Sequence, residues 1–508
     1  MFPIPSFHSS VMLIAAIFIG LMTCGSVQAE AIDIQKLLDR GEDVLLEPGS
    51  VHEIEGTLIF RKAGQRIETA GAINASGFAK IVLAPGSIGT LVNAHEVPGA
   101  TLKHLILDAQ RSAFFSEDGV IPGEPMLSFG GEGGDGQEIS HCIVLNSRSA
   151  GGWGAIHVQE GASDILIANN VVFGAGADIR GNGRAPYEKP FGFGDGISTA
   201  STRTRVFNNL IYDVTDEGIM LQGAPGSHVK DNVIVAIGRE MLGGIALIDP
   251  FGFHQIDAEA QTFDYRDIVV EENYIAAIGA RIHVGVPLGG APWNGRFAGT
   301  TLIGATVKNN HIAGGAGGYG FVVDGIEGFE VRGNTSDAIY SGLGDGWHGV
   351  KPDAPAAFLF NPETVGASEL QDEFVPMKKS LTRVIRSSRG PKDSRNALGN
   401  RDQAYPGPEA RAIVEMAYLE MLGRVPSPEE FEINSRWLQE ARVTSDTLRQ
   451  SLMATPQFID KHGFIDPLDL HTWRGERWLK LILKALSGQP DWPNARVTHE
   501  QVFKALFI

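Results

Sequence analysis

Carboxylic acids recur at one position of two neighbouring units in the middle of the chain. Asp195 lies two residues before Ile197, and Glu217 lies two residues before Ile219, with Asp216 beside it. If the two isoleucines are equivalent, Asp195 lies directly under Glu217, and three carboxyl groups crowd together on one outer ribbon of the coils. Because crowded carboxylates repel one another, one of them should have a raised pKa and keep its proton. An acid next to a base is the arrangement that hydrolysis of a glycosidic bond requires.

Basic residues occupy a similar position further along the chain. Arg281 and His283 lie on either side of Ile282, which aligns with the same isoleucines. Together with His254 and Asp249, they could supply the carboxylate neutraliser, the base and the acid of a polysaccharide lyase or a uronate C5-epimerase. Alternatively, Asp195, Asp216, Glu217 and Asp249 could hold Ca²⁺ through oxygen ligands. The sequence leaves these three chemistries open.

Three long insertions, at 174–194, 249–266 and 285–300, elaborate one region of the chain around a common strand. Long loops on a regular scaffold often carry function. Their aromatic rings could stack on sugars and their arginines could pair with uronate carboxylates, or these side chains could simply pack the loops onto the scaffold. The residues that we expect to contact a substrate are Arg180, Arg184, Tyr187, Phe191, His254, Tyr265, Trp293 and Arg296.

A repeat of short strands must position these residues. Apolar and variable residues alternate in segments such as 155–158, 196–199, 218–221, 244–247, 281–284 and 320–323, and this period of two is typical of a strand with one buried face. A recurrent asparagine accompanies each unit, at Asn146, Asn170, Asn209, Asn232, Asn273, Asn310 and Asn334. Units of about 23 residues with two or three strands predict the coils of a β-solenoid. The asparagines should form a ladder inside one bend, with coils about 4.8 Å apart.

The amino-terminal part of the repeat contains an expected cap. The segment from Ile34 to Arg40 reads as a short amphipathic helix that could close the open end of the core. From there to about residue 350 the sequence resembles the pectate-lyase-like right-handed parallel β-helix superfamily, which implies a mainly β fold with a single solenoid. A fold alone does not imply an activity.

Within that superfamily, the acidic units resemble the polygalacturonase-type hydrolases. That family has an Asp-Gly-aliphatic unit, an Asp-Asp unit and an Arg-Ile-Lys unit. The matching positions are Asp195, then Asp216 with Glu217, then Arg281 with His283 in place of the lysine. The resemblance implies that these five residues are catalytic. The sequence departs from the family in having no Asn-Thr before Asp195 and no Gly-His-Gly in the unit with Gly243.

A change of period marks a second domain. Residues 351–407 form a transition rich in Pro, Ser and charge, expected to be a linker and a carboxyl-terminal cap, and from Pro408 the apolar residues recur at helical spacing. Ser427-Pro428-Glu429-Glu430 predicts a capping box that opens a helix through Trp437, and a third helix should follow with Leu448 and Leu452 inside. The stretch AYLEMLGRVPSPEEFEINSRWL resembles a small helical domain of unknown function, similar to phycobilisome linkers, on exported bacterial proteins. We expect 408–508 to be an accessory module for an envelope or assembly partner.

The amino terminus and the charge restrict where the protein acts. An apolar run from Val11 to Met22, followed by Val27-Gln28-Ala29, predicts a signal peptide over 1–29 with cleavage after Ala29, although Cys24 leaves a lipid anchor open. Cleavage would leave residues 30–350 as the β-helix domain and Cys142 as the only cysteine, which suits a periplasmic or secreted protein. The net charge of −18 argues against nucleic acid, and no later segment predicts a membrane span. The sequence thus favours an exported protein that cleaves or modifies a polysaccharide, with a lyase or epimerase and a non-catalytic glycan-binding or matrix protein as alternatives, and either no cofactor or Ca²⁺.

Overall fold

The structure is a computed structural model of the 508-residue chain. It describes residues 32–72, 77–84, 87, 89–110, 124–148, 154–176, 194–236, 240–248, 262–277, 281–293, 299–314, 317–338, 340, 342, 355–377, 407–422, 424–440, 448 and 452.

The strands form three parallel sheets, here called sheets A, B and C, whose order in space follows their order in the chain. Sheet A comprises β1 (Val44–Leu46), β4 (Arg66–Thr69), β7 (Thr101–Lys103), β10 (Glu138–Ser140), β13 (Leu166–Ala168), β16 (Arg205–Phe207), β19 (His228–Lys230), β22 (Thr262–Glu271), β25 (Thr301–Lys308), β28 (Ile326–Glu327), β29 (Glu330–Arg332) and β32 (Glu369–Leu370). Sheet B comprises β2 (Val51–Ile54), β5 (Ala79–Leu83), β8 (Leu105–Asp108), β11 (Ile143–Leu145), β14 (Val171–Phe173), β17 (Leu210–Tyr212), β20 (Val233–Ala236), β23 (Tyr274–Ala277), β26 (His311–Ala313) and β30 (Thr335–Ser336). Sheet C comprises β3 (Leu58–Ile59), β6 (Val92–Asn93), β9 (Leu127–Gly130), β12 (Ile156–Gln159), β15 (Ile197–Thr199), β18 (Glu217–Leu221), β21 (Met241–Leu247), β24 (Ile282–Leu288), β27 (Gly317–Val323), β31 (Phe358–Phe360) and β33 (Val375–Pro376).

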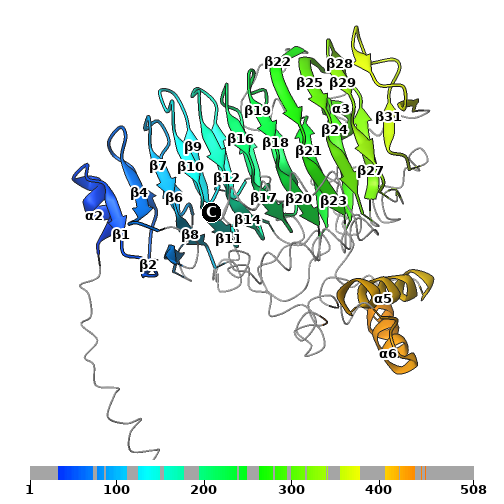
Figure 1. The fold of residues 1–508 in the computed structure, drawn as a ribbon, viewed down its shortest axis with the longest axis horizontal. Coiled ribbons are helices and arrows are strands. Elements are labelled where there is room, and N and C mark those ends of the chain that lie inside the picture. Colours follow the sequence, from blue (N-terminus) through cyan, green and yellow to red (C-terminus); the bar gives the residue numbers. More distant parts are fainter. Residues whose placement is uncertain are drawn as a thin grey trace, which may run out of the picture. The chain divides into compact units, whose positions relative to one another are not determined.

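From β1 to β27 each coil contributes one strand to each sheet in the order A, B, C, so that β16, β17 and β18 form one coil and β19, β20 and β21 form the next. Every strand pairs in parallel with its counterpart one coil away, for example Ile197 with Ile219 and Ile219 with Ile245. Figure 1 shows this stack, which rises from β1 at the blue end to β31 at the yellow end. The fold is therefore the predicted right-handed parallel β-helix.

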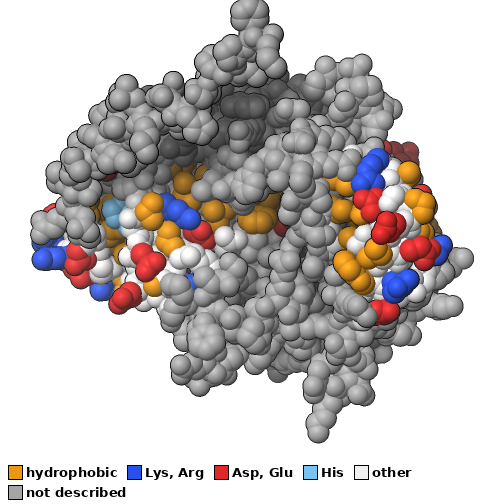
Figure 2. Space-filling model, turned by 90° about the horizontal axis from the view of Figure 1, so that it is seen from below, with side chains coloured by type: hydrophobic (Ala, Val, Ile, Leu, Met, Phe, Trp, Pro, Cys, Tyr) orange, Lys and Arg blue, Asp and Glu red, His pale blue; other side chains and the backbone are white. Residues whose placement is uncertain are grey.

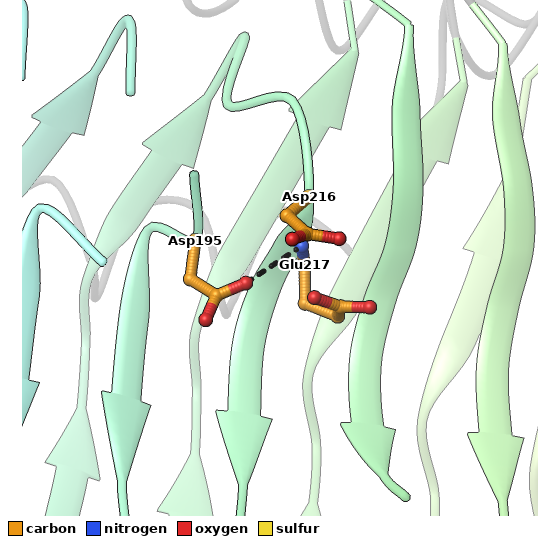
Figure 3. A group of neighbouring side chains, drawn as sticks. All are labelled: Asp195, Asp216 and Glu217. Atoms are coloured by element: carbon orange, nitrogen blue, oxygen red, sulfur yellow. Dashed lines mark hydrogen bonds between the residues drawn. The ribbon is translucent and has the colours of Figure 1, made fainter. Parts of the chain in front are cut away.

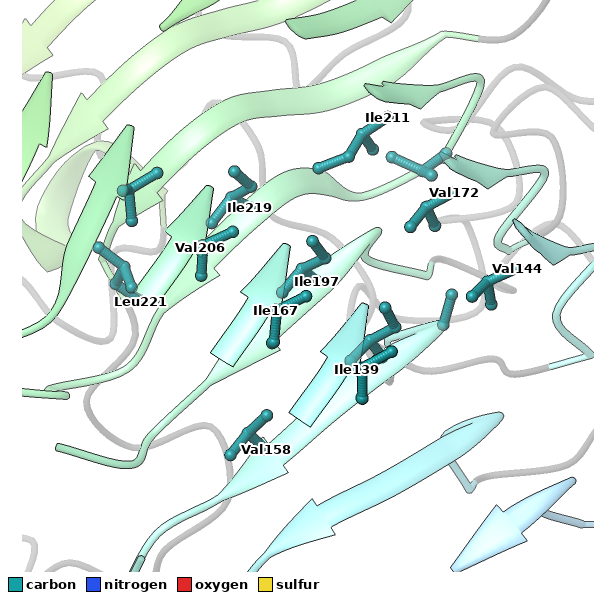
Figure 4. Close-up of a cluster of buried hydrophobic side chains, with 14 of the residues drawn as sticks. Ile139, Val144, Val158, Ile167, Val172, Ile197, Val206, Ile211, Ile219 and Leu221 are labelled. Atoms are coloured by element: carbon teal, nitrogen blue, oxygen red, sulfur yellow. The ribbon is translucent and has the colours of Figure 1, made fainter. Parts of the chain in front are cut away.

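The core is a set of aliphatic columns inside the coils. Ile139, Ile167 and Val206 stack in sheet A, and Ile197 stacks on Ile219 in sheet C, all with no exposed surface (Figure 4). Burial of each such side chain stabilises the fold by about 1.5–3 kcal/mol. Since the columns repeat in each coil, the fold gains stability by adding coils.

A short helix closes the first coil, as predicted. Helix α2 (Ile34–Asp39) places Ile34 and Leu38 in the main apolar cluster. The side-chain amide of Gln35 donates to the carbonyl of Ile59 at 3.2 Å, and the side-chain amide of Gln65 donates to the carbonyl of Leu38 at 3.0 Å. These bonds attach the helix to the first strands, so it shields one end of the core from water.

The predicted asparagine ladder lies in the bend between sheets A and B. The side-chain amide nitrogen of each member donates to the amide oxygen of the next at 2.9–3.0 Å, along Asn170, Asn209, Asn232, Asn273, Asn310 and Asn334. Gln371 continues it at one end, and at the other the backbone amide of Cys142 donates to Asn170.

One asparagine was assigned to this ladder wrongly. Asn146 follows β11 in a different bend, where it has a φ of 56° and its amide donates to Asp108 at 3.0 Å. Asparagine also suits left-handed turn positions. A Leu-Asn pair in the sequence therefore does not distinguish the two bends.

The three long insertions do not leave from one end of a strand. The first enters sheet C ahead of β15, whereas the other two follow β21 and β24 at the opposite ends of their strands. Parts of the second and third are regular structure: β22 already begins at Thr262, β24 continues to Leu288, and helix α3 (Gly290–Trp293) follows. The described residues that border the insertions therefore lie at both ends of the strands of sheet C.

The stacked strands continue past residue 350. Strands β31 and β33 add to sheet C and β32 adds to sheet A, within the range expected to hold a linker and a cap. Further on, two helices pack together, α5 (Gly407–Leu422) and α6 (Pro428–Gln439). The predicted capping box is present, with the amide of Glu430 donating to the hydroxyl of Ser427 at 3.2 Å. Among the described residues, no helix is long and apolar enough to span a membrane.

Candidate functional site

Three carboxyl groups meet where the chain passes from sheet B into sheet C. Asp195 lies just before β15, Asp216 just before β18, and Glu217 is the first residue of β18. One oxygen from each lies within 4.8 Å of the others (Figure 3). We call Asp195, Asp216 and Glu217 the acidic cluster. The cluster is the juxtaposition that equal coil lengths predict.

Backbone bonds hold the acidic cluster across two coils. The amide of Gly196 donates to the carbonyl of Glu217 at 2.8 Å, and the amide of Glu217 donates to Oδ1 of Asp195 at 3.2 Å (Figure 3). The amide of Asp216 donates to the carbonyl of Gly194 at 3.1 Å, and its own carbonyl accepts from Leu242 in the next coil. The positions of all three carboxylates therefore depend on the ladder of the solenoid itself.

Local packing requires the glycines that follow Asp195 and Glu217. A Cβ on Gly196 would lie 2.6 Å from Cγ2 of Ile211, and a Cβ on Gly218 would lie 2.6 Å from Cγ2 of Ile234. Both contacts are far too short for carbon atoms, so a larger residue would push sheets B and C apart at this corner. The acid-glycine pairs are thus explained by the corner, whether or not the acids are catalytic.

A third glycine makes room for Glu217. A Cβ on Gly243, the residue paired with Glu217 in the next coil, would lie 3.1 Å from Cγ of Glu217. The side chain of Glu217 therefore extends over Gly243 toward the following coil. Absence of a side chain at residue 243 lets the glutamate fit without distorting the sheet.

The acidic cluster is almost entirely buried. Asp195 and Glu217 have no exposed surface, and Asp216 is 7% exposed. The sequence predicted these side chains on an outer ribbon, but they lie in the bend at the start of sheet C. Asp216 is therefore the one member of the cluster with any exposed surface.

Burial controls the protonation of Glu217. It raises the pKa of Glu217 well above its ordinary value, and the nearby carboxyl groups of Asp216 and Asp195 raise that pKa further. No donor from the described residues reaches either carboxyl oxygen of Glu217. When it is protonated, Glu217 can donate a hydrogen bond to a neighbouring carboxylate and share its proton within the cluster.

The two predicted basic residues lie further along the same sheet. Arg281 immediately precedes β24, and His283 lies on β24, two coils from β18. The predicted alignment of Ile282 with Ile219 and Ile245 was wrong, because Ile282 pairs with Met241, four residues before Ile245. The imidazole Nε2 of His283 lies 3.1 Å from the carboxylate of Glu240, and both side chains are buried. Because Glu240 compensates any positive charge on His283, the imidazole is not a free cation for a uronate carboxylate.

Sequence reasoning missed Glu240. It lies just before β21 and is 43 residues from His283 in the chain. Alignment of the strands could have shown that residues 240 and 281 occupy equivalent positions, since Met241 pairs with Ile282. It could not show that the Glu240 side chain turns toward His283.

Most of the residues expected to bind substrate lie outside the described part of the chain. These are Arg180, Arg184, Tyr187, Phe191, His254 and Arg296, together with the possible cation ligand Asp249. Trp293 ends α3, but its side chain is not among those described. Tyr265 is the exception, and its assignment to the substrate surface was wrong: it is fully buried in the main apolar cluster, and its hydroxyl donates to the carbonyl of Leu221 at 3.2 Å.

An aliphatic group lies on the same sheet as the acidic cluster. Met220, Ala246 and Ile248 form a buried apolar cluster separate from the main core. These side chains offer no hydrogen bond to a sugar hydroxyl.

On the face shown in Figure 2, the described acidic and basic side chains are interspersed, without a broad area of one sign.

No protein family model matches the chain. No curated protein matches it.

Solved structures with a similar fold include enzymes and an adhesin. The mannuronan C-5 epimerase AlgE6 A-module of Azotobacter vinelandii is 14% identical, with 67% of this chain and 95% of that chain covered and a TM-score of 0.34. The endo-xylogalacturonan hydrolase of Aspergillus tubingensis is 14% identical, with 66% and 90% covered and a TM-score of 0.32. PfbA, a surface adhesin of Streptococcus pneumoniae, is 11% identical, with 61% and 84% covered and a TM-score of 0.34. At such identities the likeness concerns the fold and transfers no activity.

Proposed function

We propose that the chain is an exported protein that acts on a polysaccharide, and that the acidic cluster hydrolyses a glycosidic bond with Glu217 as the general acid. The observation that carries the proposal is the burial of Glu217 beside Asp195 and Asp216, which raises the pKa of Glu217. A carboxyl group whose pKa is raised keeps its proton to higher pH and can protonate a leaving oxygen, as the acid of a glycosidase does.

The reaction divides the cluster into an acid and a base. Glu217 gives its proton to the glycosidic oxygen while the bond from that oxygen to the anomeric carbon breaks. An ionised aspartate of the pair, Asp195 or Asp216, accepts a proton from the water that attacks the same carbon. Asp216, which is 7% exposed whereas Asp195 has no exposed surface, is the better placed of the two for contact with that water.

A second candidate function is cation binding at the same residues. Three carboxylates with no hydrogen-bond donor on either oxygen of Glu217 are hard oxygen ligands of the kind that Ca²⁺ prefers. Asp195, Asp216 and Glu217 would hold such an ion, which would neutralise the crowded charges. In that case the ion would displace the proton of Glu217, because ligands bind metals in their deprotonated form.

Reducing-end release from a panel of neutral and uronate-containing polysaccharides tests the hydrolase. Wild type should release reducing ends without forming an ultraviolet-absorbing unsaturated product, and Glu217→Gln should lower the rate by about a hundredfold or more. Asp164→Asn changes an exposed residue that pairs with Arg203. It is the matched control and should leave the rate unchanged.

Other products would identify other functions. An unsaturated product would identify a lyase. A changed uronate epimer ratio at constant chain length would identify an epimerase, and retardation of a glycan in a gel without any product would identify a binding protein.

Calorimetric titration with Ca²⁺ separates the two candidates. Cation binding predicts heat on addition of Ca²⁺ to wild type, proton uptake by the buffer, and loss of both in Asp195→Asn. A general acid predicts a rate that EDTA leaves unchanged. If EDTA abolishes the activity and Ca²⁺ restores it, Glu217 is a ligand and not the acid.

A further inference from the structure

A hydrogen-bonded chain of three side chains lies at the far end of sheet B, away from the acidic cluster. His311 begins β26, Thr335 begins β30 and Asp337 follows β30. The imidazole Nε2 of His311 lies 3.2 Å from Oδ1 of Asp337, and its Nδ1 lies 2.8 Å from the hydroxyl of Thr335. Since Thr335 pairs with His311 across neighbouring strands, the register of the sheet sets this geometry.

The protons of this chain can be assigned from its partners. A carboxylate can only accept, so Nε2 of His311 carries the proton that bonds to Asp337. The Nδ1 of the neutral ring is then an acceptor, and the hydroxyl of Thr335 must donate to it. Burial lowers the pKa of His311, which favours the neutral ring. The ring of Tyr274 stacks on the imidazole at 5.1 Å and 25°, and so fixes its orientation.

The hydroxyl is accessible, because Thr335 and Asp337 are exposed. The amides of Thr335 and Asp337 both donate back to β26, to the carbonyls of Asn310 and Ile312. Since alternate residues of a parallel strand point their amides to opposite sides, the amide of Ser336 points away from β26. In the described part of sheet B, β30 is the last strand, so this amide faces the edge of the sheet beside the hydroxyl.

We propose that Thr335 is a nucleophile for acyl transfer from oxygen esters, with His311 as its general base, Asp337 as the residue that positions His311, and the amide of Ser336 as a donor to the oxyanion. The substrate class is an alcohol that carries a small acyl group, such as an acetyl ester. This site uses none of the acidic cluster, so it stands whether or not the chain hydrolyses glycosides.

The reaction balances without a further reactant beyond water. The oxygen of Thr335 bonds to the acyl carbon while its proton passes to Nδ1 of His311. The carbon–oxygen bond of the ester breaks as the leaving alcohol takes that proton. Water then attacks the acyl-threonine with the same base, releasing the carboxylic acid and restoring Thr335.

Hydrolysis of p-nitrophenyl acetate and labelling by a fluorophosphonate probe, followed by intact mass and peptide mapping, test this site in the full chain. Wild type should hydrolyse the ester and gain one label on Thr335. Thr335→Val keeps the shape of the side chain and should lower the rate by about a hundredfold or more and abolish the label, whereas Thr335→Ser should retain both. Thr306→Val, on the neighbouring sheet, should behave as wild type.

The role of Asp337 has its own readout. Asp337→Asn should lower the rate and change its pH profile, because the amide no longer holds the proton on Nε2, while unfolding temperatures should stay unchanged. The proposal is overturned if wild type takes up no label, if the label maps elsewhere, or if Thr335→Val hydrolyses the ester as fast as wild type.

Discussion

The backbone amide of Glu217 donates to the carboxylate of Asp195 one coil away, at 3.2 Å. This bond fixes the two acidic side chains to consecutive turns of the same solenoid, so neither can move without moving a strand. Electrostatic repulsion within the acidic cluster therefore destabilises the folded state, and the effect can be measured as a change in the free energy of unfolding.

The stability of the solenoid should fall as pH rises, owing to Glu217. The pKa of Glu217 in the folded chain is well above its ordinary value of 4.5, so the folded state keeps a proton that the unfolded state loses, and unfolding is favoured as pH rises above that value. Glu217→Gln removes this term and should be more stable than wild type by about 1–3 kcal/mol near neutral pH. The gain should shrink toward about pH 4. Urea denaturation at both pH values measures it, and an equal gain at both would contradict the shift.

Alanine should not be tolerated at the glycine after Glu217. In Gly218→Ala the new Cβ would lie 2.6 Å from Ile234 and 2.7 Å from the carbonyl of Gly244, and we expect a loss of about 1–3 kcal/mol. Gly56→Ala is the matched control, because no atom lies within 4 Å of its Cβ position, and it should change stability by less than about 0.5 kcal/mol. Similar losses in both variants would show that the corner is not tightly packed.

An interior member of the asparagine ladder should contribute more than an asparagine outside it. Oδ1 of Asn232 accepts from the backbone and side-chain amides of Asn209, and its own amide donates to Asn273. Asn232→Ala leaves buried partners unsatisfied and should cost about 2–4 kcal/mol. Asn93→Ala, which removes one local bond to the amide of His95, should cost about 1 kcal/mol or less. Thermal unfolding of both variants provides the comparison.

Breaking the Glu240–His283 pair on one side should cost more than removing both partners. Both groups are buried, so Glu240→Gln removes the carboxylate that lies 3.1 Å from the imidazole and should cost about 3–5 kcal/mol. The double variant Glu240→Gln/His283→Gln should recover part of that loss. A double-mutant cycle from urea denaturation gives the coupling energy, and strictly additive single losses would refute a charged pair.

Helix α6 should lose stability in acid. The hydrogen bond from Arg424, followed by those from Ser427, lowers the pKa of Glu430 from 4.5 to about 2. Since the folded pKa is depressed, the stabilisation is present above pH 4.5 and is lost as pH falls toward 2. Ser427→Ala removes the cap and should lower the free energy of opening of α6 by about 1 kcal/mol, measured by hydrogen exchange of its amides. Unchanged exchange would mean that packing alone holds the helix.

The coil repeat could be predicted because it depends on short-range patterns. Alternation of apolar residues places Ile197 and Ile219 inside, and 22 residues between Asp195 and Glu217 make one coil. The predicted meeting of the three acids follows from that length alone. The burial of the three acids does not follow from the coil length. It depends on the conformation of the bend between sheets B and C, which strand periodicity does not predict.

Contacts between side chains that are separated by loops of variable length could not be predicted from the sequence. Glu240 reaches His283 across the insertion at 249–266, and Thr335, His311 and Asp337 meet only because β26 and β30 pair in register. Tyr265 is a residue type suited to sugar binding. However, β22 begins at Thr262, earlier than the sequence pattern indicates, and the strand directs the Tyr265 ring into the core. Residue type predicts what a side chain can do, whereas strand boundaries decide where it points.

The ladder of asparagines runs in one direction, because the side-chain amide nitrogen of each member donates to the next member and its oxygen accepts from the previous one. Every coil therefore presents the same donor face at one end and the same acceptor face at the other. Excision of residues 210–232, from one ladder asparagine to the next, would join identical faces and return the chain to register. The length of this protein can thus change in whole turns, so a longer or shorter rod requires no new fold.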